Sequence, residues 1–338
     1  MTGRATGNPS GPARRISVVT ELENAGLAGR RRAVDALEAL ARQIEAAKPG
    51  TVASAELLVA FDPEEMPADL ARGIVDDSGV EGAVAEVRYL ARPGADYFAQ
   101  KNEGAREARG DPIVFLDSDV IPRDGWVRAL LDALDDPDAE VVGSHCWIDG
   151  EDLVSRAYAL FGTFPLREEE PPRPEAGGAF LNSMGVRARV IREHPFPELP
   201  LFRNSAHLWR KSIRRAGVDV RQAPGARVIH PAPPGVGALL RRSLADGHDH
   251  YASRRVEGHG PPRALAEGLG TCALRTVRKS ARTLVKGPAV GLGPAETAAA
   301  VGLCLLSHGA RVLGCLASFV RGGRLPDPGA GWLSPRVP

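Results

Sequence analysis

Cysteine is scarce in this chain of 338 residues, and its four cysteines lie far apart. No two of them have C-x-x-C spacing, which argues against a zinc ribbon or a thioredoxin-like redox site. They also do not make a disulfide scaffold, so a reducing compartment is the simplest interpretation. Aromatic residues make up only 5% of the chain. No stacking or groove-reading motif accompanies the basic residues, so nucleic-acid binding is disfavoured.

An apolar targeting segment is also missing near residue 1. Residues 1–15 are small, polar and basic, so we expect a disordered start without a secretory signal. Gly and Pro number 38 and 28 but have no period, which excludes a collagen-like chain. With 43% hydrophobic and 25% charged residues the composition is globular, and the length suggests about two domains, at roughly 150 residues each.

The net charge of +1 hides a charge asymmetry between the two parts of the chain. Residues 236–338 contain 14 Lys and Arg against 6 Asp and Glu, whereas residues 1–235 contain 29 against 36. The basic part could meet anionic lipid, nucleic acid or the acidic body, or be a solvated basic face.

Short apolar strands alternate with helical segments over the first 150 residues. We expect strands at 16–20, 56–61, 85–90, 112–116 and 139–143, and helices at 30–47, 67–78, 97–109 and 126–134. This alternation predicts an α/β fold with a mostly parallel sheet flanked by helices. In such sheets the ligand site lies at the carboxyl ends of the strands.

The later chain has a looser pattern. We expect a strand after residue 182, a helix at 207–216 and a short strand at 228–231. From 237 to 286 the chain is basic and helical in pattern, with a break at 258–262. We therefore expect a tail at 1–14, a catalytic domain at 15–235, a basic helical extension at 236–325 and a second tail at 326–338.

Two carboxylates follow the most apolar strand, separated by one residue. Residues 115–122 have the sequence FLDSDVIP, so Asp117 and Asp119 leave the strand together. Hard divalent cations such as Mg²⁺ bind one or two carboxylates plus substrate phosphates. A metal there could neutralise a diphosphate leaving group. An isolated D-x-D is, however, more often a polar turn or a helix cap.

The surrounding residues favour the catalytic interpretation. Residues 100–105 (QKNEGA), residues 108–111 (ARGD), the apolar strand, the D-x-D, Pro122 and Trp126 together closely resemble the family 2-like glycosyltransferases of the GT-A fold. The resemblance covers about 15–235 and is strongest across 97–130. It implies a Rossmann-like GT-A fold that moves a sugar from a nucleotide-diphosphate donor to a hydroxyl acceptor.

The resemblance also implies roles for individual residues. A metal, Mn²⁺ or Mg²⁺, would bind Asp119 and the diphosphate, with His230 as a second ligand or phosphate contact, although a lone His is usually structural. Asp117 would contact the ribose or base, and Asp62 the base. The remaining residues of the predicted nucleotide-sugar site are Thr20, Glu21, Glu23, Lys101, Asn102, Gly177 and Gly178.

One expected carboxylate is missing. The family usually places a Glu-Asp pair at the start of the helix near 204–215, where the Asp is the general base of an inverting displacement. Residues 201–209 here are LFRNSAHLW and contain no carboxylate. His207 could act as the base, since its ordinary pKa near 6.5 suits the task. Alternatively Glu198 could approach from the preceding loop, or the chain could be a retaining or degenerate member.

Other classes of protein use parts of this pattern. Haloacid dehalogenase-type phosphatases place D-x-D on their first strand, whereas at least three strands precede it here. A nucleotidyltransferase would need a Gly-rich basic first loop, but residues 21–24 (ELEN) are acidic. A non-catalytic sugar-nucleotide-binding or scaffold protein of the same fold remains the alternative to an enzyme.

Residues 301–320 form a mostly apolar stretch as long as a membrane span. His308 and Arg311 near its middle offset the gain from the leucines, so a single span is not favoured. Five basic residues upstream suit an interfacial helix on anionic lipid, while a core helix is the alternative. We therefore expect a cytoplasmic protein, peripheral on the inner face of the membrane, with a lipid-linked or cell-envelope acceptor.

Overall fold

One mixed sheet forms the centre of the protein. The structure, a computed structural model, describes residues 13–48, 50–166 and 180–322. In this part of the chain eight strands pair in the order β3-β2-β1-β4-β7-β6-β8-β5. Their bounds are β1 (Arg14–Glu21), β2 (Val52–Phe61), β3 (Glu86–Ala91), β4 (Ile113–Leu116), β5 (Ile121–Pro122), β6 (Val141–Asp149), β7 (Ser183–Val186) and β8 (Val220–Pro231).

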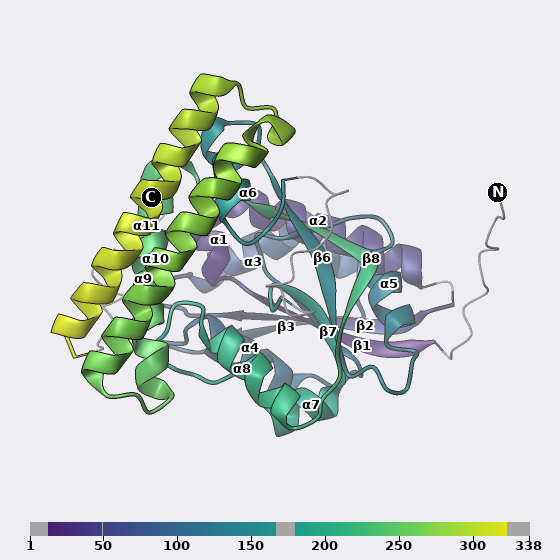
Figure 1. The fold of residues 1–338 in the computed structure, drawn as a ribbon. Coiled ribbons are helices and arrows are strands. Elements are labelled where there is room, and N and C mark those ends of the chain that lie inside the picture. Colours follow the sequence, from purple (N-terminus) through teal and green to yellow (C-terminus); the bar gives the residue numbers. More distant parts are fainter. Residues whose placement is uncertain (1–12, 49, 167–179, 323–338) are drawn as a thin grey trace.

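The central strands are apolar because both of their faces are covered. Along β4, Val114 and Leu116 join one hydrophobic core, and Ile113 and Phe115 join the other. Successive side chains of a strand point to opposite faces, so a continuous apolar run suits a strand buried on both sides. In Figure 1 helices α2, α3 and α5 cover one face of the sheet, and α4, α7 and α8 cover the other.

The helices account for most of the remaining described chain. Those of the α/β body are α1 (Glu23–Ala28), α2 (Arg30–Ala47), α3 (Ala68–Ser78), α4 (Tyr97–Glu107), α5 (Trp126–Ala133), α6 (Leu153–Phe161), α7 (Ala188–Glu193) and α8 (Ser205–Arg215). Three longer helices follow, α9 (Gly235–Val256), α10 (Pro261–Lys286) and α11 (Pro294–Val320). They stack together at one end of the sheet, against α6 (Figure 1).

The order in which strands are added to the sheet reverses at β1. From β1 the chain winds outward through β2 to β3, all parallel, and then returns to place β4 parallel on the other side of β1. Such a switch point opens a crevice at the carboxyl ends of the two strands. Beyond β4, strand β7 runs antiparallel to both β4 and β6, so the sheet is mixed.

The expected α/β fold with a helical C-terminal region is confirmed. The helix at 30–47 has the predicted bounds, and the expected break at 258–262 separates α9 from α10. Three expectations are corrected. Strands β2, β6 and β8 are longer than predicted. Elements β5, α1, α6 and α7 were not predicted, and Arg14 belongs to β1 rather than to a tail. Residues 1–12 and the predicted tail at 326–338 lie outside the described residues.

Helices α9 and α11 approach each other closely at Gly247 of α9 and Gly314 of α11. A Cβ on Gly314 would lie far inside van der Waals contact with the Leu244 backbone, whereas one on Gly302 of the same helix would meet nothing within 4 Å. We expect Gly314→Ala to destabilise the protein by about 3 kcal/mol through overpacking. Gly302→Ala should stabilise it by about 0.5–1 kcal/mol, because Ala is the better helix former. Urea unfolding measures both, and equal effects would contradict the close helix packing.

Candidate active site

The carboxyl ends of β1 and β4 are joined at the switch point. The Thr20 hydroxyl of β1 donates a hydrogen bond of 2.8 Å to the Leu116 carbonyl of β4. Glu21 follows Thr20, and Asp117 follows Leu116, so two buried carboxylates enter the same crevice. Burial and the nearby Asp117 charge raise the pKa of Glu21 to about 8.

The first Asp of the D-x-D is fully bonded to the protein. Its Oδ1 accepts from the Lys101 ammonium at 2.6 Å and from the Tyr97 hydroxyl at 2.9 Å. Its Oδ2 accepts from the Asn24 amide at 3.0 Å and also from Tyr97. Lys101 is completely buried and donates a further bond to the Leu181 carbonyl. Asp117 therefore holds α4 and α1 together, and its contact with a ribose stays a prediction.

Asn24 connects this cluster to Arg203, which precedes α8. The Asn24 side chain donates to Glu21 and accepts from the Arg203 guanidinium at 3.0 Å. Arg203 lies over the Tyr97 ring, 4.2 Å from its centroid, and pairs with Glu23 at 3.3 Å. The predicted nucleotide residues Glu21 and Glu23 are therefore bonded to side chains that the sequence pattern did not single out.

The second Asp of the motif has a different environment. Asp119 is 6% exposed, and its Oδ1 has no hydrogen-bond partner among the described residues. Burial and the neighbouring Asp117 raise the pKa of Asp119 to about 7, although Arg32, Arg203 and Arg242 lower it. A buried carboxylate without a partner is costly, so this position favours a cation.

His230 lies at the end of β8 with one ring nitrogen occupied. Its Nδ1 donates to the Pro231 carbonyl at 2.7 Å, which leaves Nε2 as the nitrogen with a lone pair. Burial and the charge of Arg242 lower the pKa of His230 to about 3, so the ring is neutral at pH 7. The Phe164 ring packs against it, with centroids 5.0 Å apart. A neutral, oriented imidazole is the form that binds metals.

Arg32 links the turn that carries Asp119 to strand β8, which carries His230. Its Nε donates to the Asp119 carbonyl at 2.8 Å, and its other nitrogens donate to the Asp149 carboxylate and the Ile229 carbonyl. The site thus lies among positive side chains from α2, from the segment before α8 and from α9. Such a set of cations suits an anionic ligand such as a diphosphate.

A buried carboxylate from α9 reaches the start of α8. Asp249 accepts hydrogen bonds of 2.7–2.8 Å from the backbone amides of Phe202, Arg203 and Asn204. It therefore satisfies amides before α8, whose N-cap Asn204 makes no side-chain cap bond. Burial raises the pKa of Asp249 to about 7, although these three bonds lower it. Asp249 thus fixes the segment that presents Arg203.

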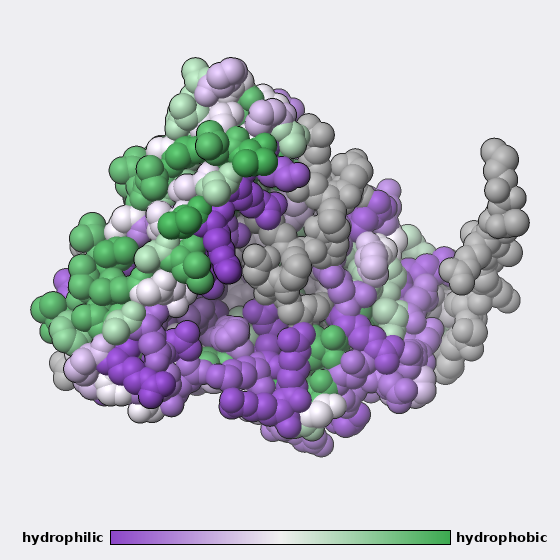
Figure 2. Space-filling model, viewed as in Figure 1, coloured by the Kyte–Doolittle hydropathy of each residue, from purple (hydrophilic) through white to green (hydrophobic). Residues whose placement is uncertain are grey.

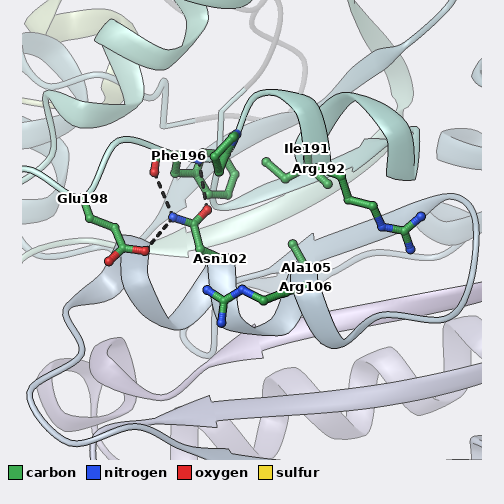
Figure 3. A pocket seen from close by; sticks show the side chains of 8 residues that line it. Asn102, Ala105, Arg106, Ile191, Arg192, Phe196 and Glu198 are labelled. Atoms are coloured by element: carbon green, nitrogen blue, oxygen red, sulfur yellow. Dashed lines mark hydrogen bonds between the residues drawn. The ribbon is translucent and has the colours of Figure 1, made fainter.

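Asn102 and Glu198 lie at a separate pocket. The Asn102 amide donates to Glu198 at 3.0 Å and to the Phe196 carbonyl, and it accepts from the Phe196 amide (Figure 3). Both line a cavity of about 520 Å³ whose other walls include Arg106 and Arg192, with neither Asp of the motif among them. The donor contact of Asn102 and the base role of Glu198 therefore stay predictions.

His207, the other predicted base, lies on the exposed side of α8. Burial of its ring and the charge of Arg210 lower the pKa of His207, whereas Glu257 raises it. Among the described residues no hydrogen bond links it to the D-x-D turn, so its role also stays a prediction.

Asp62, buried after β2, accepts from the Glu64 amide at 2.9 Å. Gly177 and Gly178 lie outside the described residues.

Three buried carboxyls predict a pH dependence of stability. The folded-state pKa values of Glu21, Asp119 and Asp249 are raised to about 8, 7 and 7, from 4.5 and 3.8 for ordinary Glu and Asp. The folded state therefore binds more protons than the unfolded state, and stability falls as pH rises through these values. The lowered pKa of His230 acts in the opposite direction only below its ordinary 6.5.

We accordingly expect the free energy of unfolding to fall by about 1–3 kcal/mol between pH 6.5 and 8.5. Urea titrations at both pH values, with and without Mn²⁺, measure the change. Mn²⁺ should reduce it, because a bound cation favours the ionised carboxylate. Stability that rises over this interval would contradict the raised pKa values.

Local patterns identified only part of this site. Asn24 and Tyr97 lie inside the motif-bearing segments but gave no sign of bonding Asp117. Asp249 belongs to the stretch GHDH at 247–250, whose two histidines are placed two residues apart in a helix and do not share a face. The two ring nitrogens of His248 are occupied by hydrogen bonds to the Pro200 carbonyl and the Ser318 hydroxyl.

The sequence matches known glycosyltransferases. Residues 74–188 match the model of glycosyl transferase family 2. The chain is 28% identical over 234 residues to a pre-mycofactocin glycosyltransferase of Mycobacterium tuberculosis, covering 66% of this chain and 44% of that protein. It is 25% identical to glycosyltransferase AglE of Haloferax volcanii, covering 44% of this chain and 49% of that protein. The chain thus spans less than half the length of these curated relatives.

The fold also matches a solved structure. The mannosyltransferase PcManGT of Pyrobaculum calidifontis, in complex with GDP-Man and Mn²⁺, superposes with a TM-score of 0.55 over 93% of this chain and 88% of that one. At 16% identity the likeness concerns the fold. The chain therefore resembles glycosyl transferase family 2 over residues 74–188, about a third of its length, and it shares the GT-A fold of a solved mannosyltransferase.

Proposed function

We propose that this protein transfers a sugar from a nucleotide-diphosphate donor to a hydroxyl acceptor. The observation that supports this most directly is Asp119, a buried carboxylate with an unpartnered oxygen at the switch point of the sheet. The family match and the positive side chains around the crevice agree with a diphosphate there.

The residues present suit a divalent metal. Asp119 would supply a carboxylate and His230 its Nε2, a pair that Mn²⁺ accepts more readily than the strictly oxygen-seeking Mg²⁺. Within the described ranges no three His, Cys, Asp or Glu side chains could hold a metal together. Further ligands would therefore come from diphosphate and water. When bound, the metal supplies positive charge that stabilises the leaving diphosphate.

The chain's own residues would position the donor. Arg32, Arg203 and Arg242 would attract the diphosphate, because each acts on Asp119 by its charge. Thr20, Glu21, Glu23 and Asp62 would line the nucleotide pocket beside them. Lys101 would act through Asp117 rather than on the donor, since its ammonium is buried against that carboxylate.

The acceptor base is the open part of this proposal. Asp249 is the carboxylate at the start of α8, but three backbone amides occupy it, so we assign it a positioning role. His207 or Glu198 would then serve an inverting displacement. A retaining or degenerate member of the fold is the alternative. For the acceptor of this cytoplasmic protein we propose a lipid-linked or cell-envelope hydroxyl. Helix α9 bonds the segment before α8 through Asp249 and packs against α10 and α11, which expose apolar side chains.

Calorimetric titration of UDP and GDP, with and without Mn²⁺ at pH 8, tests the proposal. We expect one nucleotide to bind and its affinity to depend on the metal. If UDP, GDP, TDP and CDP all failed to bind with Mn²⁺ and with Mg²⁺, the proposed function would be overturned. Binding without turnover of the matching nucleotide sugar in a membrane extract would instead favour the degenerate, donor-binding alternative.

A further inference from the structure

The outward faces of α10 and α11 are apolar. On α10 the exposed side chains include Val277 and Val285, which are 69% and 72% exposed, and on α11 Val320 is 81% exposed. Nine of the eleven exposed large hydrophobic residues in the described chain lie on these two helices, and Figure 2 shows them gathered at one edge of the molecule. We define the outer face by these nine: Leu274, Val277, Leu284, Val285, Leu305, Leu306, Leu313, Leu316 and Val320.

The spacing of these residues is helical, so each helix presents one stripe. On α11, Leu306, Leu313, Leu316 and Val320 recur at intervals of three, four or seven residues. The opposite stripe, which includes Arg311, is buried against the protein. The outer face therefore faces away from the protein and has no partner among the described residues.

Polar contacts hold α11 against the protein. By length and composition α11 could cross a membrane, but half of its most apolar stretch is buried in the fold. Arg311 pairs with Asp246 of α9 at 3.2 Å, and the hydroxyls of Ser307 and Ser318 bond Ser243 and His248 at 2.8 Å. A spanning helix would have to break these buried bonds, which is costly. Helix α11 is thus suited to lie along a bilayer surface rather than across it.

The charge around the outer face is mostly positive. Residues 268–295 contain five basic residues and no Asp or Glu, and the one acidic residue of 268–320 is Glu296 in the first turn of α11. Arg278 and Lys286 are exposed, and each lies next in sequence to an apolar member of the outer face. A basic stripe beside an apolar one is the pattern of helices that bind anionic lipid.

We propose that the outer face docks the protein on an anionic lipid bilayer, with α10 and α11 lying in the headgroup region. A second copy of the chain suits this face less well, because two such faces would bring like charges together. The inference does not depend on the sugar transfer proposed above.

Flotation of the full chain with vesicles tests the inference. We expect binding to phosphatidylcholine vesicles that contain 30% phosphatidylglycerol, and at least about 10-fold weaker binding to pure phosphatidylcholine. Arg278→Ala/Lys286→Ala should lower the partition coefficient about 30-fold, at roughly tenfold per 1.4 kcal/mol and about 1 kcal/mol per basic residue. Leu306→Glu/Leu313→Glu should reduce it at least as much.

Matched variants separate docking from misfolding. Arg31→Ala/Arg42→Ala removes the same charge from exposed positions of α2 and should leave vesicle binding unchanged. Thermal unfolding should show that the glutamate variant remains folded. Equal binding to neutral and anionic vesicles, or an unchanged glutamate variant, would overturn the inference. A dimer that Leu306→Glu/Leu313→Glu dissociates, without vesicle binding, would assign the face to a second copy instead.

Discussion

Asp119→Asn is expected to weaken Mn²⁺-dependent nucleotide binding at least about 100-fold, more than loss of a residue that merely orients a metal ligand. The amide keeps the shape of the side chain but removes the negative charge that would hold the cation. Calorimetry with the nucleotide that the wild-type protein binds measures the loss. Asp138→Asn, at an exposed turn, should retain wild-type affinity.

The Asp119→Asn variant should also be more stable than the wild-type protein at pH 8 without metal. Above its raised pKa of about 7, Asp119 is a buried charge that destabilises the fold, and asparagine removes it. A gain in stability with a loss of binding is the signature of a ligand-binding residue. If Asp119→Asn instead lowered stability and left nucleotide binding intact, the D-x-D would be a structural turn.

Lys101→Met is expected to destabilise the protein by about 3–5 kcal/mol, because it leaves the buried Asp117 carboxylate without its cation. The ammonium lies 2.6 Å from that carboxylate, and both side chains are nearly inaccessible, at 0% and 4% exposure. Tyr97 and Asn24 still donate to Asp117, but neither supplies a charge. Urea unfolding measures the loss.

A double-mutant cycle isolates this pair. Lys101→Met/Asp117→Asn should be more stable than Lys101→Met alone, because no unpaired charge remains. A coupling free energy above about 2 kcal/mol is expected for residues in one buried network. Strictly additive effects would show that Lys101 contributes only its packing against Tyr97 and Phe115.

Most strands and helices of the first 150 residues were predictable because their signals are local, whereas α6 and α7 were not predicted. The apolar run ending at Leu116 required a strand buried on both faces, and the two carboxylates after it had to emerge at its carboxyl end. The alternation of strands and helices likewise determined an α/β fold. These inferences need only neighbouring residues, so folding could not overturn them.

The partners within the site were decided by tertiary structure alone. Asp117 meets Lys101, Tyr97 and Asn24, which are 16, 20 and 93 residues away in the sequence. The two Asp residues of one motif therefore differ: Asp117 is fully bonded, and Asp119 has an unpartnered oxygen. No periodicity distinguishes them, because the difference depends on which distant side chains arrive.

The C-terminal helices show the same division. Sequence determined that 236–320 is basic, helical and partly apolar, because composition and spacing suffice for that. Only the folded arrangement brings Asp249 to the amides of 202–204 and buries one stripe of α11 while exposing the other. Which face of a helix is covered depends on the elements that pack against it, and these are set by the whole chain.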